Sequence, residues 1–186
     1  MPSEDESNNC LQDHLPYEIN MLRVAAIRLT KIKAPSTDAN ICIEMFCVHA
    51  RNLIEFFDER RKQAGDFKAN QFAKDYRREF DLEDQRRRIN WRIAHLTTER
   101  VRGDQKKISV GECLRTYTKL EYEIERFIAC LPPQTRSAFS ARLKRVPQQT
   151  VVVAAAENML RNATNTVSPS ISTYVEGAPP PHKADK

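Results

Sequence analysis

Residues 39–62, ANICIEMFCVHARNLIEFFDERRK, contain neither proline nor glycine, and this stretch decides the fold class. At 100° per residue its apolar side chains gather on one wide face, as expected for a helix. That face comprises Ile41, Met45, Val48 and Phe56, extended by Phe46, Ala50, Leu53 and Phe57. The narrow opposite edge holds the charged residues Glu44, Arg51, Glu55 and Asp58. So wide an apolar face predicts a long helix that is buried in a bundle.

The flanking segments predict three further long helices. The first begins after Pro16 and ends at Ala34-Pro35, and Ser36-Thr37-Asp38 offers three N-cap candidates for the helix that follows. Two more are expected over residues 82–102 and 110–131. Residues 64–81 are expected to be an irregular link with one short helix near 72–80, and residues 135–145 to form a short basic helix. The pattern predicts an all-α fold, an antiparallel four-helix bundle with additional short helices.

Composition divides the chain into three parts. Residues 1–15 are predicted to be an acidic flexible arm, because the first 13 contain four acids and no Lys or Arg. Residues 16–146 are predicted to form the helical bundle domain. Residues 147–186 include a Ser/Thr/Pro-rich end that cannot bury enough apolar area to offset the entropy of ordering it, so a flexible, disordered C-terminal tail is expected.

Several classes of function have no support in the composition. Four glycines are too few for a turn-rich β fold, and no glycine-rich phosphate loop is present. The five cysteines lack a CxxC pair and the four histidines are far apart, so we expect no metal site and no cofactor. Neither a secretory signal nor a run of about 20 apolar residues is visible, which predicts no membrane association and a cytoplasmic location.

The helix expected over residues 82–102 carries the most suggestive polar residues. Residues 84–107, which extend five residues past this helix, contain eight Lys or Arg and three Asp or Glu, a composition that suits a polyanionic partner. Arg88 and His95 are seven positions apart, two helical turns, so their side chains project along nearly the same line. A guanidinium can hold a phosphate through paired donors, and an imidazole titrates near neutral pH. The alternative interpretation is a solvated, arginine-rich helix face.

Two motifs on these helices resemble the HEPN superfamily (higher eukaryotes and prokaryotes nucleotide-binding). They are HARNLIEFF at residues 49–57 and RINWRIAHL at residues 88–96. Arg88 and His95 match the family's Arg-x(4–6)-His motif, although Ile89 stands where the family usually has a polar residue and Asn90 follows one place later.

The resemblance implies a metal-independent ribonuclease, or an inactive relative, acting in bacterial defence or stress. It implies a homodimer with two Arg/His pairs across a shared cleft, where the 2′-hydroxyl of RNA attacks the neighbouring phosphate. His95 would move the proton, Arg88 would bind the phosphate, and Asn90 would orient one of them. The further basic residues expected to contact RNA are Arg87, Arg92 and Arg102.

A second polar pair lies in the helix over residues 39–62. His49 and Asn52 fall within its apolar sector, where buried polar groups need partners. They are binding candidates, or structural residues that reach toward one another or toward another helix.

Two other functions stay open for the protein: a non-enzymatic helical module that binds a protein or nucleic-acid partner, and a structural bundle that oligomerises through apolar helix faces.

Overall fold

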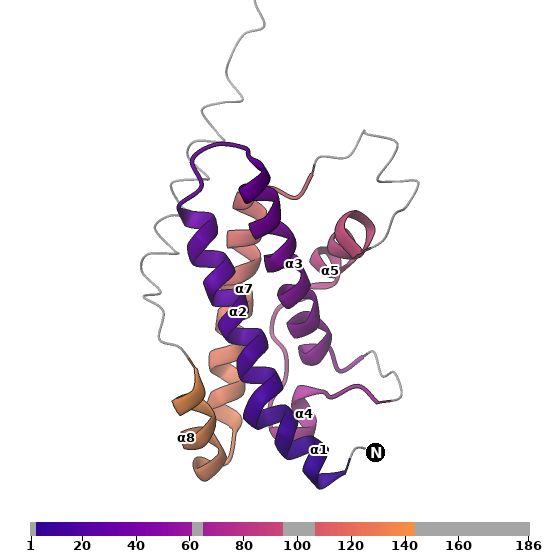
Figure 1. The fold of residues 1–186 in the computed structure, drawn as a ribbon. Helices are drawn as coiled ribbons and strands as arrows, with labels where there is room; N and C mark the ends of the chain where they lie inside the picture. The colour runs from indigo at the N-terminus through magenta and orange to yellow at the C-terminus, as the bar shows by residue number, and fades with distance from the viewer. Residues whose placement is uncertain (1–2, 61–64, 95–106, 144–186) are drawn as a thin grey trace, which may run out of the picture.

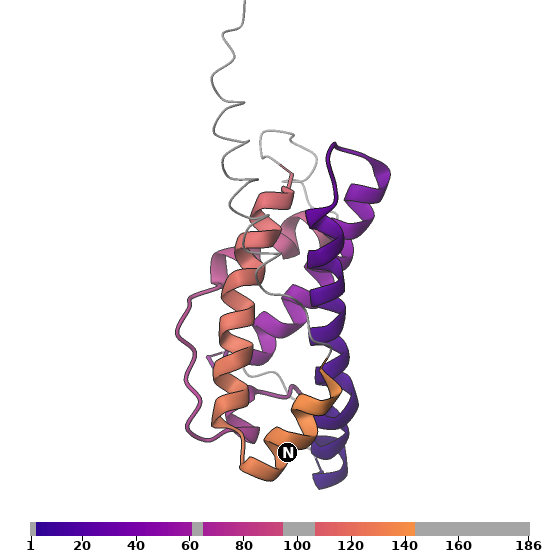
Figure 2. The same ribbon diagram turned by 90° about the vertical axis from the view of Figure 1, so that its left-hand side faces the viewer.

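The computed structural model describes residues 3–60, 65–94 and 107–143, and these residues are helical with irregular connections and no strand. The predicted all-α fold is therefore confirmed. Three long helices form the centre: α2 (Leu15–Thr30), α3 (Thr37–Phe57) and α7 (Val110–Cys130). α2 runs opposite to both α3 and α7, and each of the three packs on the other two (Figures 1 and 2).

Shorter elements cover the ends and one side of this centre. α4 (Ala69–Phe72) follows α3, and α5 (Glu83–Ile89) continues into a π-helical turn, η2 (Asn90–Ala94), that packs on α3. α8 (Pro133–Arg142) packs on α7 and on the N-terminal η1 (Cys10–His14). Between α4 and α5 the chain runs back along α7 as an irregular segment (Figure 2).

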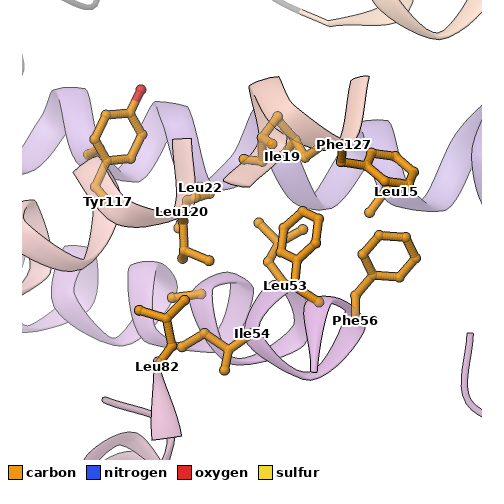
Figure 3. Packing of buried hydrophobic residues seen from close by; sticks show 14 of the residues in the cluster. Leu15, Ile19, Leu22, Leu53, Ile54, Phe56, Leu82, Tyr117, Leu120 and Phe127 are labelled. Carbon is orange, nitrogen blue, oxygen red and sulfur yellow. The ribbon is translucent and has the colours of Figure 1, made fainter. Parts of the chain in front are cut away.

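The core is built mainly from apolar side chains of the three long helices, which meet in the space between them, and Leu82 packs against them from outside these helices (Figure 3). Phe127 of α7 is its aromatic centre, with ring centroids of four other aromatic residues between 5.4 and 6.0 Å away. Those four are Phe56, Phe57, Tyr76 and Phe139. Edge-to-face packing of this kind adds to the stabilisation that burial of the rings provides.

Helix starts follow the expected capping chemistry. Ser36, one of the three predicted N-cap candidates, accepts the backbone N–H of Ala39 at 3.1 Å. Ser109 and Glu112 form a reciprocal capping box at the start of α7, and Pro133 occupies the first turn of α8. The predicted bounds of α7 and the short basic helix after it are confirmed to within a few residues.

The prediction of a flexible arm at the N-terminus was wrong, because residues 4–15 of this segment are helical. α1 (Glu4–Asn9), η1 and α2 follow one another directly, and a Ser3–Glu6 capping box starts the first of them. Cys10 is buried against the bundle, and Arg142 of α8 holds the segment by donating to the carbonyl of Gln12 and the carboxylate of Asp13. Acidic residues in a first helical turn are favourable, so their abundance is compatible with a helix as well as with an arm.

Three further expectations need correction. α3 ends at Phe57 rather than near residue 62, because Asp58 turns inward and is almost fully buried. Ile41 and Val48 are 57% and 50% exposed, so the core face of α3 is narrower than predicted. The short helix is α4, and residues 73–80 are not helical. Of the helix predicted over 82–102, residues 83–94 are helical and residues 95–102 lie outside the described part of the chain. The predicted tail over 147–186 also lies outside the described part.

Candidate functional site

A cleft of about 490 Å³ opens between α3, α5 and α7, and we call it the cationic cleft. It is lined by Phe46, Cys47, Asp84, Gln85, Arg87, Arg88, Ile89, Ile108, Glu112, Cys113, Arg115, Thr116 and Lys119. Four of these side chains are basic and two are acidic, so the cleft carries a net positive charge.

Each wall of the cleft follows from helical spacing. On α7, positions 112, 115, 116 and 119 share one face, which places a polar stripe along the opening. On α5, Arg87 and Arg88 are consecutive residues, and both line the cleft. Phe46 and Cys47 of α3, both 1% exposed, form the apolar floor. The cleft therefore combines a basic rim with an apolar base.

Arg88 lies on the wall of the cleft, with 43% of its side chain exposed. Its Nη1 atom is 2.5 Å from Oε1 of Glu112, which is the N3 residue of the capping box of α7. The guanidinium is therefore engaged by a carboxylate at the position where an anionic ligand would bind. A phosphate must compete with Glu112 for Arg88.

The other basic residues of the cleft differ in their partners. Arg87 pairs with Asp84 at 3.0 Å. Lys119 lies over the ring of Phe80, with Nζ 5.7 Å from the centroid. Within the described part of the chain, neither Lys119 nor Arg115 forms an ion pair. These two cations are therefore the most available for an anion.

Cys47 and Cys113 lie together at the base of the cleft. Both side chains are 1% exposed. The neighbouring thiol of Cys47, together with burial, holds the pKa of Cys113 well above its usual value. A protonated, buried thiol is a poor nucleophile, so the pair is an apolar part of the floor. In the described residues, no cluster of His, Cys, Asp and Glu is arranged to bind a metal ion.

Of the two remaining catalytic candidates, the structure describes Asn90 but not His95. Asn90 begins η2, and its Oδ1 is buried without a hydrogen-bond partner among the described residues. His95 lies outside the described residues, so its distance from Arg88 stays untested. π-Helical turns occur often at functional sites, and this one carries Asn90 directly beside the cleft-lining Ile89.

Only one of the predicted binding residues within the described part of the chain lines the cationic cleft. Arg87 lines the cleft, Arg92 is half-buried in η2, and Arg102 lies outside the described residues. His49 and Asn52 reach another helix, which was one of the predicted alternatives: Nδ1 of His49 is 2.7 Å from Oε2 of Glu18, and the amide of Asn52 donates to the same oxygen at 3.2 Å. Neither residue lines the cationic cleft, so they link α3 to α2 and are not part of this site.

Two lining residues, Arg115 and Lys119, were missed from the sequence. Their spacing with Glu112 and Thr116, at positions i, i+3, i+4 and i+7, is a visible signal for one polar face on α7. The sequence does not reveal which helix this face meets, because that contact is non-local.

No protein-family model, no curated protein and no solved structure matches this chain, so the residues of the cleft are the basis for its function.

Proposed function

We propose that the cationic cleft binds the phosphates of RNA and that the chain cleaves RNA as a HEPN-like, metal-independent ribonuclease. The observation that carries the proposal is the position of Arg88, half-exposed on the wall of a cleft whose rim also presents Arg87, Arg115 and Lys119. A recess with four basic side chains attracts polyanions and holds phosphate oxygens through charge-assisted hydrogen bonds.

In the proposed reaction the 2′-hydroxyl of one nucleotide attacks the adjacent phosphorus. The bond between phosphorus and the 5′-oxygen of the next nucleotide breaks, and a 2′,3′-cyclic phosphate remains. Arg88 stabilises the negative charge that builds on the phosphoryl oxygens, and His95 transfers a proton to or from the reacting oxygens. Asn90, with its unsatisfied buried oxygen, orients one of these groups. In a homodimer, two such pairs would face a shared cleft.

Labelled single-stranded RNA incubated in EDTA tests the proposal. We expect cleavage by the wild type and a loss of about 100-fold or more in both His95→Ala and Arg88→Ala, which is typical of removing a proton-transfer group or a charge-stabilising donor. Arg28→Ala is the charge-matched control, since Arg28 is exposed on α2 and does not line the cleft. Cleavage that His95→Ala leaves unchanged would rule out the mechanism.

A second candidate, a module that binds RNA without cleaving it, is favoured by the Arg88–Glu112 ion pair. A catalytic guanidinium held by a carboxylate at 2.5 Å is less free to stabilise a transition state. On this alternative the wild type binds RNA with an affinity that falls steeply with salt, and no product forms. Binding assays over a range of salt concentrations, run beside the cleavage assay, distinguish the two functions.

A further inference from the structure

Trp91, which the proposed reaction does not use, lies one helical turn from Arg87, a residue that lines the cationic cleft. It is the only tryptophan in the chain, and it belongs to η2, directly after α5. Its side chain is 41% exposed, although tryptophan has the largest surface to gain from burial. A large aromatic side chain at the surface of a cationic site points to a ligand with a flat apolar part.

Arg87 joins Trp91 to the cleft. The guanidinium carbon of Arg87 lies 5.2 Å from the centroid of the indole, a cation–π contact between residues one helical turn apart. The same Arg87 lines the cleft. The aromatic surface and the phosphate-binding rim are therefore neighbours on one side of α5.

Other exposed aromatic residues lack this combination. Tyr122 is 46% exposed and also lies near an arginine, with the guanidinium carbon of Arg126 5.8 Å from its ring. Tyr122 and Arg126 do not line the cleft. The described residues thus contain two arginine–aromatic pairs with exposed rings, one beside the cleft and one away from it, which supplies a matched control.

We infer that Trp91 is a stacking platform for an unpaired nucleobase of a single-stranded nucleic acid whose phosphates occupy the cationic cleft. The inference rests on the proposed RNA binding and narrows it to single strands. An indole stacks on any base because every base has a π-face, whereas in a duplex the bases are already stacked on one another. An arginine beside the ring strengthens the site by contacting the phosphate or the base.

The intrinsic fluorescence of the protein tests this directly, because its tryptophan emission comes from Trp91 alone. Titration with a single-stranded RNA oligonucleotide should quench that emission in a saturable manner. An abasic oligonucleotide of the same length should bind through charge alone and quench little, and the matching duplex should bind more weakly. By anisotropy of labelled RNA, Trp91→Ala should weaken single-strand binding roughly ten-fold and Trp91→Phe should weaken it less.

Tyr122→Ala is the control and should leave RNA affinity unchanged. Circular dichroism of each variant verifies the helical fold, and Trp91→Phe keeps the test valid if the alanine variant does not fold. RNA binding with unchanged fluorescence and equal affinities for wild type, Trp91→Ala and duplex would overturn the stacking inference and leave phosphate binding intact. The absence of salt-dependent binding to any of the three nucleic acids would instead overturn the proposed function, and the inference with it.

Discussion

Glu112 bridges two parts of the site. Its Oε1 lies 2.5 Å from Nη1 of Arg88, while its Oε2 accepts the backbone N–H of Ser109 at 2.8 Å. The same carboxylate therefore caps α7 and neutralises the guanidinium that the proposed chemistry requires. Glutamine can also serve as the third residue of a capping box, so the two roles are separable by mutation.

Glu112→Gln is expected to raise RNA affinity. The substitution keeps the cap and removes a charge that competes with phosphate for Arg88, so a gain of about five-fold at low salt is expected, equivalent to about 1 kcal/mol. Fluorescence anisotropy at several salt concentrations measures it. Glu125→Gln makes the same charge change on α7 outside the cleft, at a carboxylate 3.7 Å from Arg23, and should have less effect. Equal gains in both variants would show that net charge, not release of Arg88, is responsible.

A buried tyrosine–carboxylate pair should be visible in stability. Tyr76 donates to Oε2 of Glu123 at 2.8 Å, and the two residues are 1% and 0% exposed. Burial and the neighbouring carboxylate raise the pKa of Tyr76, so it stays a donor at all ordinary pH values. Tyr76→Phe should lower the free energy of unfolding by about 1–2 kcal/mol in urea denaturation, because it leaves a buried carboxylate short of one donor.

Tyr122→Phe is the matched control for that experiment. The hydroxyl of Tyr122 donates to Glu79 at 3.0 Å at the exposed surface, so its loss should change stability by less than about 0.5 kcal/mol. Equal effects of the two substitutions would contradict the importance of burial at Tyr76.

Acid should destabilise the fold through Asp58. Burial of this carboxyl opposes its ionisation, but hydrogen bonds from the side chain and backbone of Arg60 and the charge of Arg78 outweigh that effect, so its pKa lies below the ordinary value. A carboxyl with a lowered pKa in the folded state stabilises the protein fully above its unfolded pKa of about 3.9, and the contribution is lost as pH falls through the folded pKa. Urea midpoints measured from pH 6 downward should therefore fall near pH 4 and below.

Asp58→Asn should flatten this pH dependence and lower stability at pH 7 by about 2 kcal/mol, the order expected for losing hydrogen bonds to charged groups. If the variant loses stability toward low pH as steeply as the wild type, other carboxylates are responsible. Asp81, whose pKa is lowered by the backbone N–H of Glu83 and by Arg60, is the next to test.

Thiol reactivity should follow burial. Cys130 is exposed and should react first with a thiol reagent such as DTNB. Burial raises the pKa of Cys10 to about 11, and Cys47 and Cys113 are buried in mutual contact, so these three should react slowly, at rates limited by opening of the fold. Cys130→Ser should remove the earliest labelling. Rapid modification of Cys113 in that variant, mapped by mass spectrometry, would show that the floor of the cleft is open to solvent.

The sequence predicted the long helices well, because their signals are local. Apolar periodicity identified the three long helices and the helical residues 83–94, and serine and proline marked several helix ends. The sequence predicted the width of the buried face of α3 less well. A periodicity of 100° per residue groups Ile41 and Val48 with core residues, but it does not reveal how far the neighbouring helices cover that face. Tertiary contacts decide that boundary, and they are not encoded in one helix.

The residues of the cleft could be predicted only in part, because some of them come together through tertiary contacts. Arg87 and Arg88 could be identified on one short segment, and they do line the cleft. Arg115 and Lys119 join them only because α5 and α7 line the same cleft. Likewise, the partner of His49 and Asn52 is Glu18, 31 and 34 positions away, so the sequence alone could indicate that a partner was needed but not which residue supplies it.

The carboxylate of Glu123 also constrains how the chain can vary in length. Besides the hydroxyl of Tyr76, it accepts the backbone N–H groups of Glu79 and Phe80 at 2.8 and 2.7 Å, which fixes an irregular segment to α7 at three points. Connections without regular structure are ordinarily where insertions and deletions are tolerated. Here a single added or deleted residue between positions 76 and 80 would break the match, so we expect relatives of this chain to preserve the length of that interval even where its other side chains diverge.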